Sequence, residues 1–518
     1  MSFKIKDIIK KWEIHNGVTM KKLFITIITT QFLISGCSYF TFQKENGLTT
    51  KVCEDFYDEL EDVIDDDDAN DRQFSRMKDF PYLRSNRFLA SFYDEVENTA
   101  NFKNWVDLLQ QNAFQANKIE IANLSESKRN ELLKFMPKSM EKETDVNLLV
   151  EKCSATLRTS DLALDANRQL LIDQSRVASS YSTLRRIAGL YYPVKYAVDW
   201  SIKREYAKVA ERYKTELSKI KTKGKVTRYY PKQQEVQLSK LNVARIIRRS
   251  AFNHLRVPLP EGKELDDLFY TYAPIWEVDV VKNNDLIGKP FWEKGKKYPS
   301  IDTKTPVSYQ FISHVRYEDK IFLQLNYVIW FSGRSSKSAL DGQSGRMAGL
   351  TWRVTLNDVG EPILYDSTHN CGCYHHFYPT NKLAKRAGDF DKGELMIAPQ
   401  KQIPEFKLGQ RLVLPLAHND HFLLRVYNEN DYKNEKKEYS LAPYDELRSI
   451  ALDKRHKSLF DEDAIVPGSK RWQGWYLASL GIDDAGSLKQ VGSQATAYTG
   501  KRHFDDAYLL ERYFVLKK

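Results

Sequence analysis

The densest group of metal-binding and redox-active side chains lies at residues 369–376, which read HNCGCYHH. This octet has His369, Cys371, Cys373 and His375 at alternating positions. Thiolate and imidazole are ligands that suit Zn²⁺ and Cu(I), whereas hard cations prefer oxygen. Two cysteines one residue apart also suit thiol–disulfide chemistry. The octet is therefore the main candidate for a functional site.

A metal site built from the octet needs ligands from elsewhere in the chain. In an extended strand its four alternating side chains share one face, but the outer two lie about 20 Å apart. Gly372 allows the backbone to bend so that Cys371 and Cys373 can approach one ion. The segment LPLAHNDHFLLRVY predicts two strands and a tight turn flanked by His418 and His421. If these hairpins neighbour in one sheet, we expect a Cys2His2 or Cys2His site for Zn or Cu.

Other interpretations of the octet stay open. In an oxidising compartment, Cys371 and Cys373 form a redox pair or a vicinal disulfide. Alternatively the octet is structural, with buried thiols and hydrogen-bonded histidines. A nucleophilic enzyme has weaker support: Cys371 has His369 and His375 as neighbouring bases and Asp366 to orient one of them, but adjacent residues often point apart. The sequence contains neither the zinc-deaminase pattern nor HExxH, so no reaction follows from it.

The elements expected to position the octet form a β-rich domain at residues 258–437. The predicted strands are rich in β-branched and aromatic residues. They include YAPIWEVDVV, VSYQFISHVRYE, KIFLQLNYVIWF, LTWRVTL, ILYDST, RLVLPLA and HFLLRVYN. The sequence NDVGEP predicts a hairpin turn between LTWRVTL and ILYDST. KIFLQLNYVIWF is typical of a strand covered on both faces, and residues 438–518 mix helical with irregular sequence.

Residues 37–257 have mainly helical periodicity. Apolar residues recur three and four positions apart in RFLASFYDEVENTANFKNWVDLLQQNA and in DLALDANRQLLIDQSRVASSYSTLRRIAGLYY. Two further predicted helices flank KTKGKVTRYYPKQQ, whose glycine and proline indicate a turn and hence an antiparallel helical hairpin. The expected fold class is α+β: a helical N-terminal region with a helical hairpin, followed by a mainly antiparallel β-rich domain.

A sequence typical of export begins at Met20. Two lysines precede an apolar run of 12 residues at 23–34, which is the length of a signal peptide and too short to span a bilayer. The ISGC that ends at Cys37 resembles the lipobox of bacterial lipoproteins. This resemblance implies that Cys37 receives a diacylglyceryl group and that the signal is cut before it.

By the same resemblance, the new amino terminus is acylated too, with a chain such as palmitate, and several acyl chains anchor a protein stably. Residues 1–36 then comprise an upstream stretch and the signal peptide, with translation expected to start at Met20. Ser38 stands where an aspartate would favour retention in the inner membrane. We therefore expect a lipid anchor at the periplasmic face of the outer membrane.

Cys53 and Cys153 stand alone beside helix-like sequence. An oxidising compartment allows such a pair to bond, so a disulfide is predicted between them. The alternative is two free buried thiols.

The 518-residue chain has a net charge of +10, and its basic residues are unevenly distributed. Residues 201–256 contain 16 Lys and Arg against four Glu. The simpler interpretation is a solvated helix surface. The more specific interpretation is a basic arm that binds anionic lipid or a glycan. No nucleic acid is expected as a partner in the periplasm.

The segments FPYLRSNRFLASF, LQLNYVIWF, GLTWRVTL and YDSTHNCGCYHHFYP together are similar to a group of proteobacterial lipoproteins, over most of the chain after Cys37. This resemblance implies a lipid anchor and carries no activity. We expect an outer-membrane lipoprotein whose octet is a soft-metal site, structural or used in metal handling or hydrolysis. The alternatives are a non-enzymatic envelope protein that binds a partner, glycan or lipid, and a thiol–disulfide protein.

Overall fold

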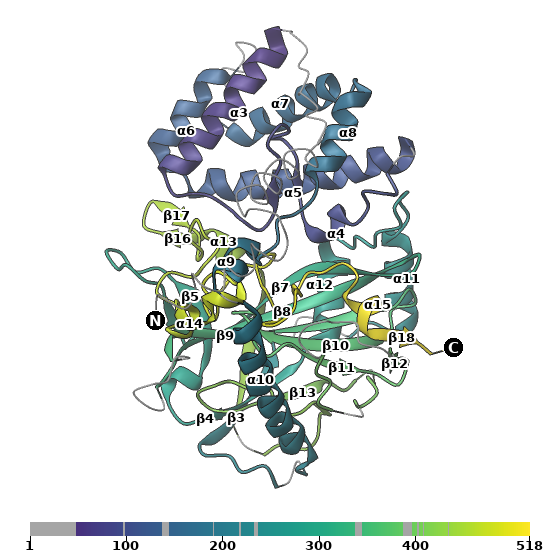
Figure 1. Ribbon diagram of the computed structural model, residues 1–518, viewed down its shortest axis with the longest axis vertical. Helices are drawn as coiled ribbons and strands as arrows, with labels where there is room; N and C mark the ends of the chain where they lie inside the picture. Colours follow the sequence, from purple (N-terminus) through teal and green to yellow (C-terminus); the bar gives the residue numbers. More distant parts are fainter. Residues whose placement is uncertain are drawn as a thin grey trace, which may run out of the picture.

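The computed structural model describes residues 48–517, apart from 97–98, 137–144, 190, 217–218, 233–236, 337–343, 387–395, 401–402, 408 and 434. The expected start at Met20, the signal within residues 1–36 and the lipidation site Cys37 therefore lie outside the described residues. Figure 1 shows a helical N-terminal layer stacked on a region built around a large sheet.

The N-terminal layer is formed by helices at the start of the described chain. They are α3 (Leu48–Asp66), α4 (Arg87–Ala90), α5 (Thr99–Asn123), α6 (Glu126–Leu132), α7 (Val146–Asp161) and α8 (Asp165–Gln174). Tyr57, Trp105 and Leu157 belong to the apolar core between them. Cys53 of α3 and Cys153 of α7 form the predicted disulfide.

The rest of the chain is organised around one large, mostly antiparallel sheet. In spatial order its strands are β11 (His376–Pro379), β10 (Pro362–His369), β9 (Gly345–Leu356), β8 (Lys320–Arg334), β7 (Val307–Tyr317), β15 (Glu435–Pro443), β3 (Lys225–Pro231), β4 (Ile275–Val280), β13 (Leu412–Leu416) and β14 (Tyr427–Asn428). Only β15 with β3, β15 with β7, and β13 with β4 are parallel among these described neighbours. The expected α+β class, with helices first and a mainly antiparallel sheet after them, is confirmed.

Shorter strands complete the β structure. β5 (Ile287–Phe291) pairs with β8 and with β6 (Ser300–Asp302). Three separate pairs are β1 (Ser75–Arg76) with β2 (Arg84–Ser85), β12 (Leu383–Lys385) with β18 (Phe514–Leu516), and β16 (Ile450–Leu452) with β17 (Arg455–Lys457).

Both faces of the sheet are covered, as the sequence of β8 predicts. On one face, α10 (Tyr191–Lys214), α11 (Lys240–Ser250) and α12 (Gly262–Tyr272) pack over Leu325 and Tyr327 of β8. On the other, the C-terminal segment covers Phe322 and Trp330 of the same strand. That segment contains α13 (Asp445–Arg448), α14 (Gln473–Leu477) and α15 (Leu509–Tyr513), and α9 (Thr183–Ala188) lies beside the end of α14.

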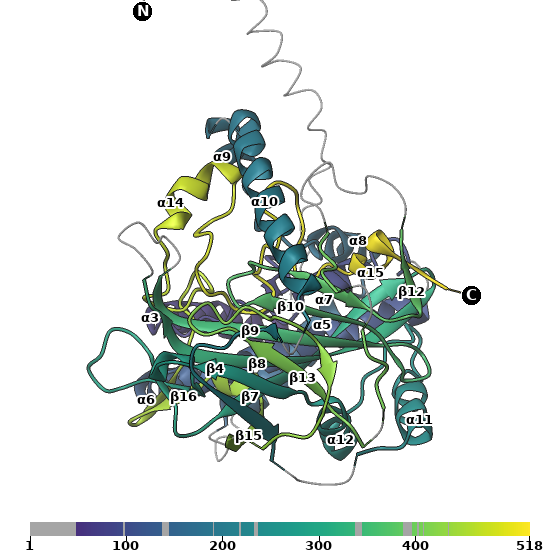
Figure 2. The same ribbon diagram turned by 90° about the horizontal axis from the view of Figure 1, so that it is seen from below.

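The predicted helical hairpin is wrong in its connection. Both helices form, as α10 and α11, but the segment between them contains strand β3 instead of a simple turn. β3 pairs with β4 and with β15, so its neighbours come from distant parts of the sequence. The two helices consequently lie apart on the molecule rather than side by side (Figures 1 and 2).

The sheet also crosses the expected domain limits. β3 comes from residues 37–257, which were expected to be helical, and β15 spans the expected boundary at residues 437 and 438. The segment 438–518 supplies side chains to the cores on the sheet. The β-rich part is therefore assembled from three sequence regions, and it positions the octet between β10 and β11.

Candidate functional site

The octet forms the end of the β10–β11 hairpin. Ser367 pairs with His376, and residues 370–375 make a compact turn between the strands. Inside it the His369 amide donates to the Cys373 carbonyl (2.9 Å) and the Gly372 amide donates to the His369 carbonyl (2.7 Å). Gly372 (φ +87°) and Tyr374 (φ +54°) have left-handed backbone conformations. Because the chain turns here, the expected alternation of side chains on one face is wrong.

The turn brings the two thiols of the octet together. A hydrogen bond from the Cys373 thiol reaches Cys371, and both cysteines are partly buried thiols. They line a small cavity of about 40 Å³ with His369, Arg334, Arg471 and other residues. That volume admits a few atoms of a reacting group, and it is much smaller than the sites that hold organic cofactors.

The surroundings of Cys371 favour its thiolate. The hydrogen bond from Cys373 is the largest influence and lowers the pKa of the Cys371 thiol to about 7, although burial acts in the opposite direction. The Arg471 guanidinium lowers this pKa further. Burial lowers the pKa of the Lys489 ammonium, and Asp483, Asp484 and the two sulfurs act in the opposite direction. A thiol with such a pKa is substantially ionised near neutral pH and hence nucleophilic.

Cys373 has a different partner. Its sulfur lies 2.9 Å from the Tyr498 hydroxyl. Burial, with the nearby cysteines, raises the pKa of Tyr498 well above its ordinary value, so the phenol keeps its proton and can donate it to the Cys373 sulfur. Tyr498 therefore supplies a hydrogen bond to Cys373 whenever that sulfur carries negative charge.

Asn370 fixes the turn to the C-terminal segment. Its buried side chain accepts a hydrogen bond from the Thr351 hydroxyl (2.9 Å), and its carbonyl accepts from the Lys489 amide (2.9 Å) and the Gln494 side chain (3.2 Å). A Cβ on Gly372 would lie 2.2 Å from the Ala495 carbonyl oxygen, so only glycine fits this close approach. The spacing of the two cysteines is thus held by long-range contacts.

His375 lies away from the thiol cavity. Its Nε2 is 2.9 Å from Asp366, and Asp366 accepts two hydrogen bonds from Arg353 at 2.9 and 2.6 Å. Burial lowers the pKa of His375 to about 4 despite the carboxylate. Burial would raise the pKa of Asp366, but Arg353 and then His375 hold it below its ordinary value. This is a buried structural network, and it orients no base toward Cys371.

The second predicted donor pair also diverges. His418 and His421 flank the expected turn, but the Nδ1 of His418 lies 3.3 Å from Asp279 and the Nε2 of His421 lies 3.4 Å from Asp285. The His421 ring stacks on Phe331 with centroids 3.8 Å apart. Both histidines are therefore engaged with carboxylates, Asp279 in β4 and Asp285 just before β5, rather than with the cysteines.

Of the six predicted ligands, the structure gathers His369, Cys371 and Cys373 around one cavity and leaves His375 and His418 elsewhere. His421 lies beside His369, but its ring faces Asp285. Burial lowers the pKa of His369 to about 3, which keeps its imidazole neutral. Within the part of the chain that the structure describes, no group of three or more His, Cys, Asp or Glu side chains is arranged to hold a metal ion.

Several residues around the thiols were not predicted from the sequence. They are Arg334, Asp420, Arg471, Lys489 and Tyr498. Arg334 ends β8 and Asp420 lies in the turn after β13, and the others come from the irregular C-terminal segment. No spacing links these positions to the octet, so only the folded chain brings them together.

The basic segment 201–256 reaches the surface mainly through helices. On α11, Arg245 and Arg248 lie near two exposed apolar side chains, Leu241 (79% exposed) and Phe252 just after the helix (95% exposed). Such a mixture of cations and exposed apolar groups suits the surface of an anionic membrane.

Comparison with known proteins gives no assignment: no family model, no curated protein and no solved structure matches this chain. Among the helices of the described chain, none has the length and apolarity needed to cross a bilayer.

Proposed function

We propose that this protein is a periplasmic lipoprotein whose Cys371–Gly372–Cys373 turn performs thiol–disulfide exchange with a protein disulfide. The observation that carries the proposal is that the turn places Cys371 and Cys373 in the wall of one small cavity with Arg471. The influence of Cys373 lowers the pKa of the Cys371 thiol. Arg471 and Lys489 add positive charge beside the sulfurs. Low thiol pKa, a positive environment and partial exposure are the properties of a reactive cysteine.

The exchange proceeds in two steps. The Cys371 thiolate attacks one sulfur of the partner's disulfide, that S–S bond breaks, and the other partner sulfur leaves as a thiolate. The Cys373 thiolate then attacks the Cys371 sulfur, which releases the second partner sulfur and leaves a Cys371–Cys373 disulfide. The partner disulfide gains two electrons from the Cys371–Cys373 pair, and of the two protons that it takes up, one comes from the Cys373 thiol and the other from solvent.

The location rests on the amino-terminal sequence. The lipobox-like ISGC supports lipidation of Cys37 and a position on the periplasmic face of the outer membrane. The Cys53–Cys153 disulfide is consistent with an oxidising compartment. The cationic and apolar surface of α11 supports an additional contact with anionic lipid.

The exchange is tested by trapping its intermediate. Cys373→Ser removes the resolving thiol, so the mixed disulfide between Cys371 and the partner should accumulate in cells treated with acid and alkylated. Non-reducing electrophoresis should then show reductant-sensitive adducts of the tagged protein. Cys371→Ser is the matched control and should show none. Equal adduct levels in both variants, or none in either, would refute the assignment of Cys371 as the attacking thiol.

A second candidate is a soft-metal site that uses the same thiols. It is favoured by His369, whose neutral imidazole lines the cavity with Cys371 and Cys373. Zn²⁺ or Cu(I) would be held by the two sulfurs, with His369 available from the same wall. Elemental analysis of protein purified without chelators separates the candidates: about one zinc or copper per chain, lost in Cys371→Ser, supports the metal site.

A further inference from the structure

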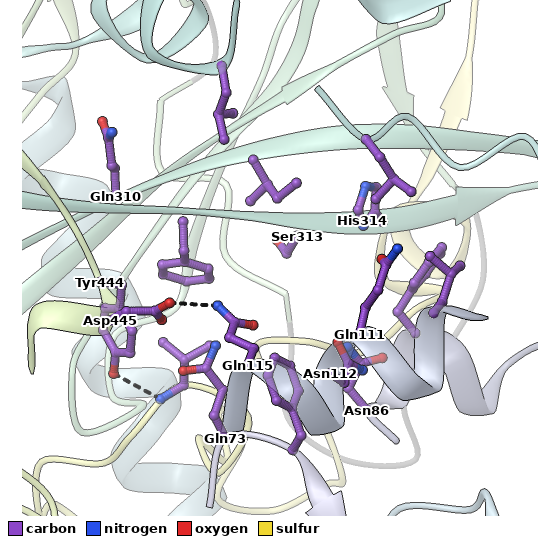
Figure 3. Close-up of a pocket in the computed structure, with 18 of the residues that line it drawn as sticks. Gln73, Asn86, Gln111, Asn112, Gln115, Gln310, Ser313, His314, Tyr444 and Asp445 are labelled. Carbon is purple, nitrogen blue, oxygen red and sulfur yellow. Dashed lines mark hydrogen bonds between the residues drawn. The ribbon is translucent and has the colours of Figure 1, made fainter. Parts of the chain in front are cut away.

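A larger cavity lies between the helical layer and the sheet, and it is separate from the thiol cavity. Its volume is about 460 Å³, within the usual size of ligand sites. The walls come from α5, from α12 and the linker before it, and from strand β7. Figure 3 shows the carboxamides of Gln111, Asn112 and Gln115 on one side and β7 on the other.

The cavity meets the edge of β7 rather than one of its faces. Residues 310–314 all line it, although successive side chains of a strand alternate between the two faces of a sheet. β15 pairs with β7 only from Val307 to Gln310, and no other described strand continues along that edge. The four lining residues beyond this pairing, 311–314, correspond to about 14 Å of edge open to the cavity.

Two hydrogen bonds show which backbone groups point outward along this edge. The Gln310 carbonyl accepts from the Tyr444 amide (2.9 Å), and the Arg316 amide donates to the Ala507 carbonyl (2.7 Å). In an antiparallel strand such groups alternate with those that bond the neighbouring strand. Ile312 and His314 lie two and four positions after Gln310, so their backbone groups point to the same side of the strand as those of Gln310 and Arg316. Their N–H and C=O groups therefore face the cavity, as an unoccupied template for another strand.

The charge of the cavity indicates the kind of strand that fits. The charged groups among its described lining residues are all carboxylates: Glu261, Asp266, Asp445 and Asp505. Asp445 bonds Arg448 and Gln115, and Asp505 bonds Arg87. Glu261 and Asp266 are exposed at the linker and α12, and neither has an ion pair within the described chain. A cationic group is the complement of these two carboxylates.

We propose that this cavity binds an extended peptide segment of a partner protein, which carries a basic residue and adds to β7 as a strand. Backbone hydrogen bonds to Ile312 and His314 fix the peptide, and the exposed Gln111 carboxamide, which has no hydrogen bond to another described side chain, supplies a further donor and acceptor. Phe88, Leu89 and Phe311 offer apolar surface for alternate side chains. The inference is independent of the thiol chemistry.

The probe is a pool of N-acetylated, C-amidated heptapeptides with one position fixed as lysine and the others randomised. Full-length protein should retain members of this pool, and a matched pool with aspartate at the fixed position should be retained at least tenfold less. In the tightest binder, N-methylation of the alternate amides that face β7 should weaken binding at least tenfold. Methylation of the intervening amides leaves the side chains unchanged as well, and it should weaken binding less than threefold.

Protein variants test the role of the two exposed carboxylates, Glu261 and Asp266. Glu261→Lys with Asp266→Lys should weaken binding at least fivefold at low salt, and Asp58→Lys on α3, an exposed acid remote from the cavity, should leave it unchanged. Thermal unfolding checks that the variants fold. No retention from the lysine pool, equal loss on both N-methylation patterns, or retention of an N-acetylglucosamine trimer in place of peptides would overturn the proposal.

Discussion

The pKa of one thiol decides the chemistry at the scale of single residues. With the pKa of Cys371 at about 7, its thiolate fraction rises as the pH increases through neutrality, below the ordinary range for cysteine near 8.5. The rate of alkylation of Cys371 by iodoacetamide, measured by mass spectrometry of the reduced protein, should therefore rise between pH 6 and 8 and level off above. Arg471→Met should move the midpoint upward. A midpoint at 8.5 or higher in the unchanged protein would contradict the thiolate environment described above.

Gly372 provides a second test at this scale. Gly372→Ala forces a Cβ into the Ala495 carbonyl and places alanine at φ +87°, so we expect a loss of stability of about 2 kcal/mol or more. The matched control is Gly409→Ala, where φ is +82° and no neighbour lies within 4 Å. Urea unfolding should show the larger loss at position 372. Equal losses would mean that the close approach of the C-terminal segment contributes nothing.

The octet shows how far sequence reasoning reaches for individual residues. The convergence of Cys371 and Cys373 through Gly372 follows from local chain geometry and could be predicted. Asp366 was predicted to orient either His369 or His375, but its choice of His375, away from Cys371, could not be predicted because it depends on a turn with two left-handed residues. Tyr498 reaches Cys373 from 125 positions away, and nothing in its local sequence marks it.

At the scale of elements, the disulfide between α3 and α7 closes a loop of about 100 residues. In the chain-entropy model such a bond stabilises the fold by about 4–5 kcal/mol. Cys53→Ser with Cys153→Ser should therefore lower the free energy of unfolding by up to that amount in urea titrations followed by circular dichroism. Cys371→Ser with Cys373→Ser serves as the control and should lose much less. A double variant of the α3–α7 pair as stable as the original would show that this bond is dispensable.

Strand β3 marks the limit of sequence reasoning for elements. Its glycine and proline neighbours satisfy the ordinary signals of a turn between two amphipathic helices. What makes it a strand is pairing with β15, whose residues follow about 200 positions later, and with β4. β8, β9 and β10 were predictable because their alternation is strong and their neighbours follow directly in sequence.

At the scale of the whole molecule, a buried ion pair joins the helical layer to the C-terminal segment. Arg448 donates to both oxygens of Asp71 at 2.8 and 2.6 Å, and both side chains are buried. Arg448→Met leaves the Asp71 carboxylate buried without its cation, which should cost about 3–5 kcal/mol in urea unfolding. Adding Asp71→Asn should recover part of this loss. If Arg448→Met and the unchanged protein had the same free energy of unfolding, this ion pair would not stabilise the contact between the helical layer and the C-terminal segment.

The central claim is that Cys371 and Cys373 form a reversible two-electron couple in the folded protein. The most direct measurement is to equilibrate the protein in a series of glutathione redox buffers and to quench each sample with acid. The free thiols are then alkylated, and the mass of the peptide that contains both cysteines is measured by mass spectrometry. We predict one transition in which two alkyl groups are lost together as the buffer becomes oxidising, and its reversal on reduction. Retention of both alkyl groups across the whole series, or glutathione adducts in place of the internal disulfide, would contradict the account.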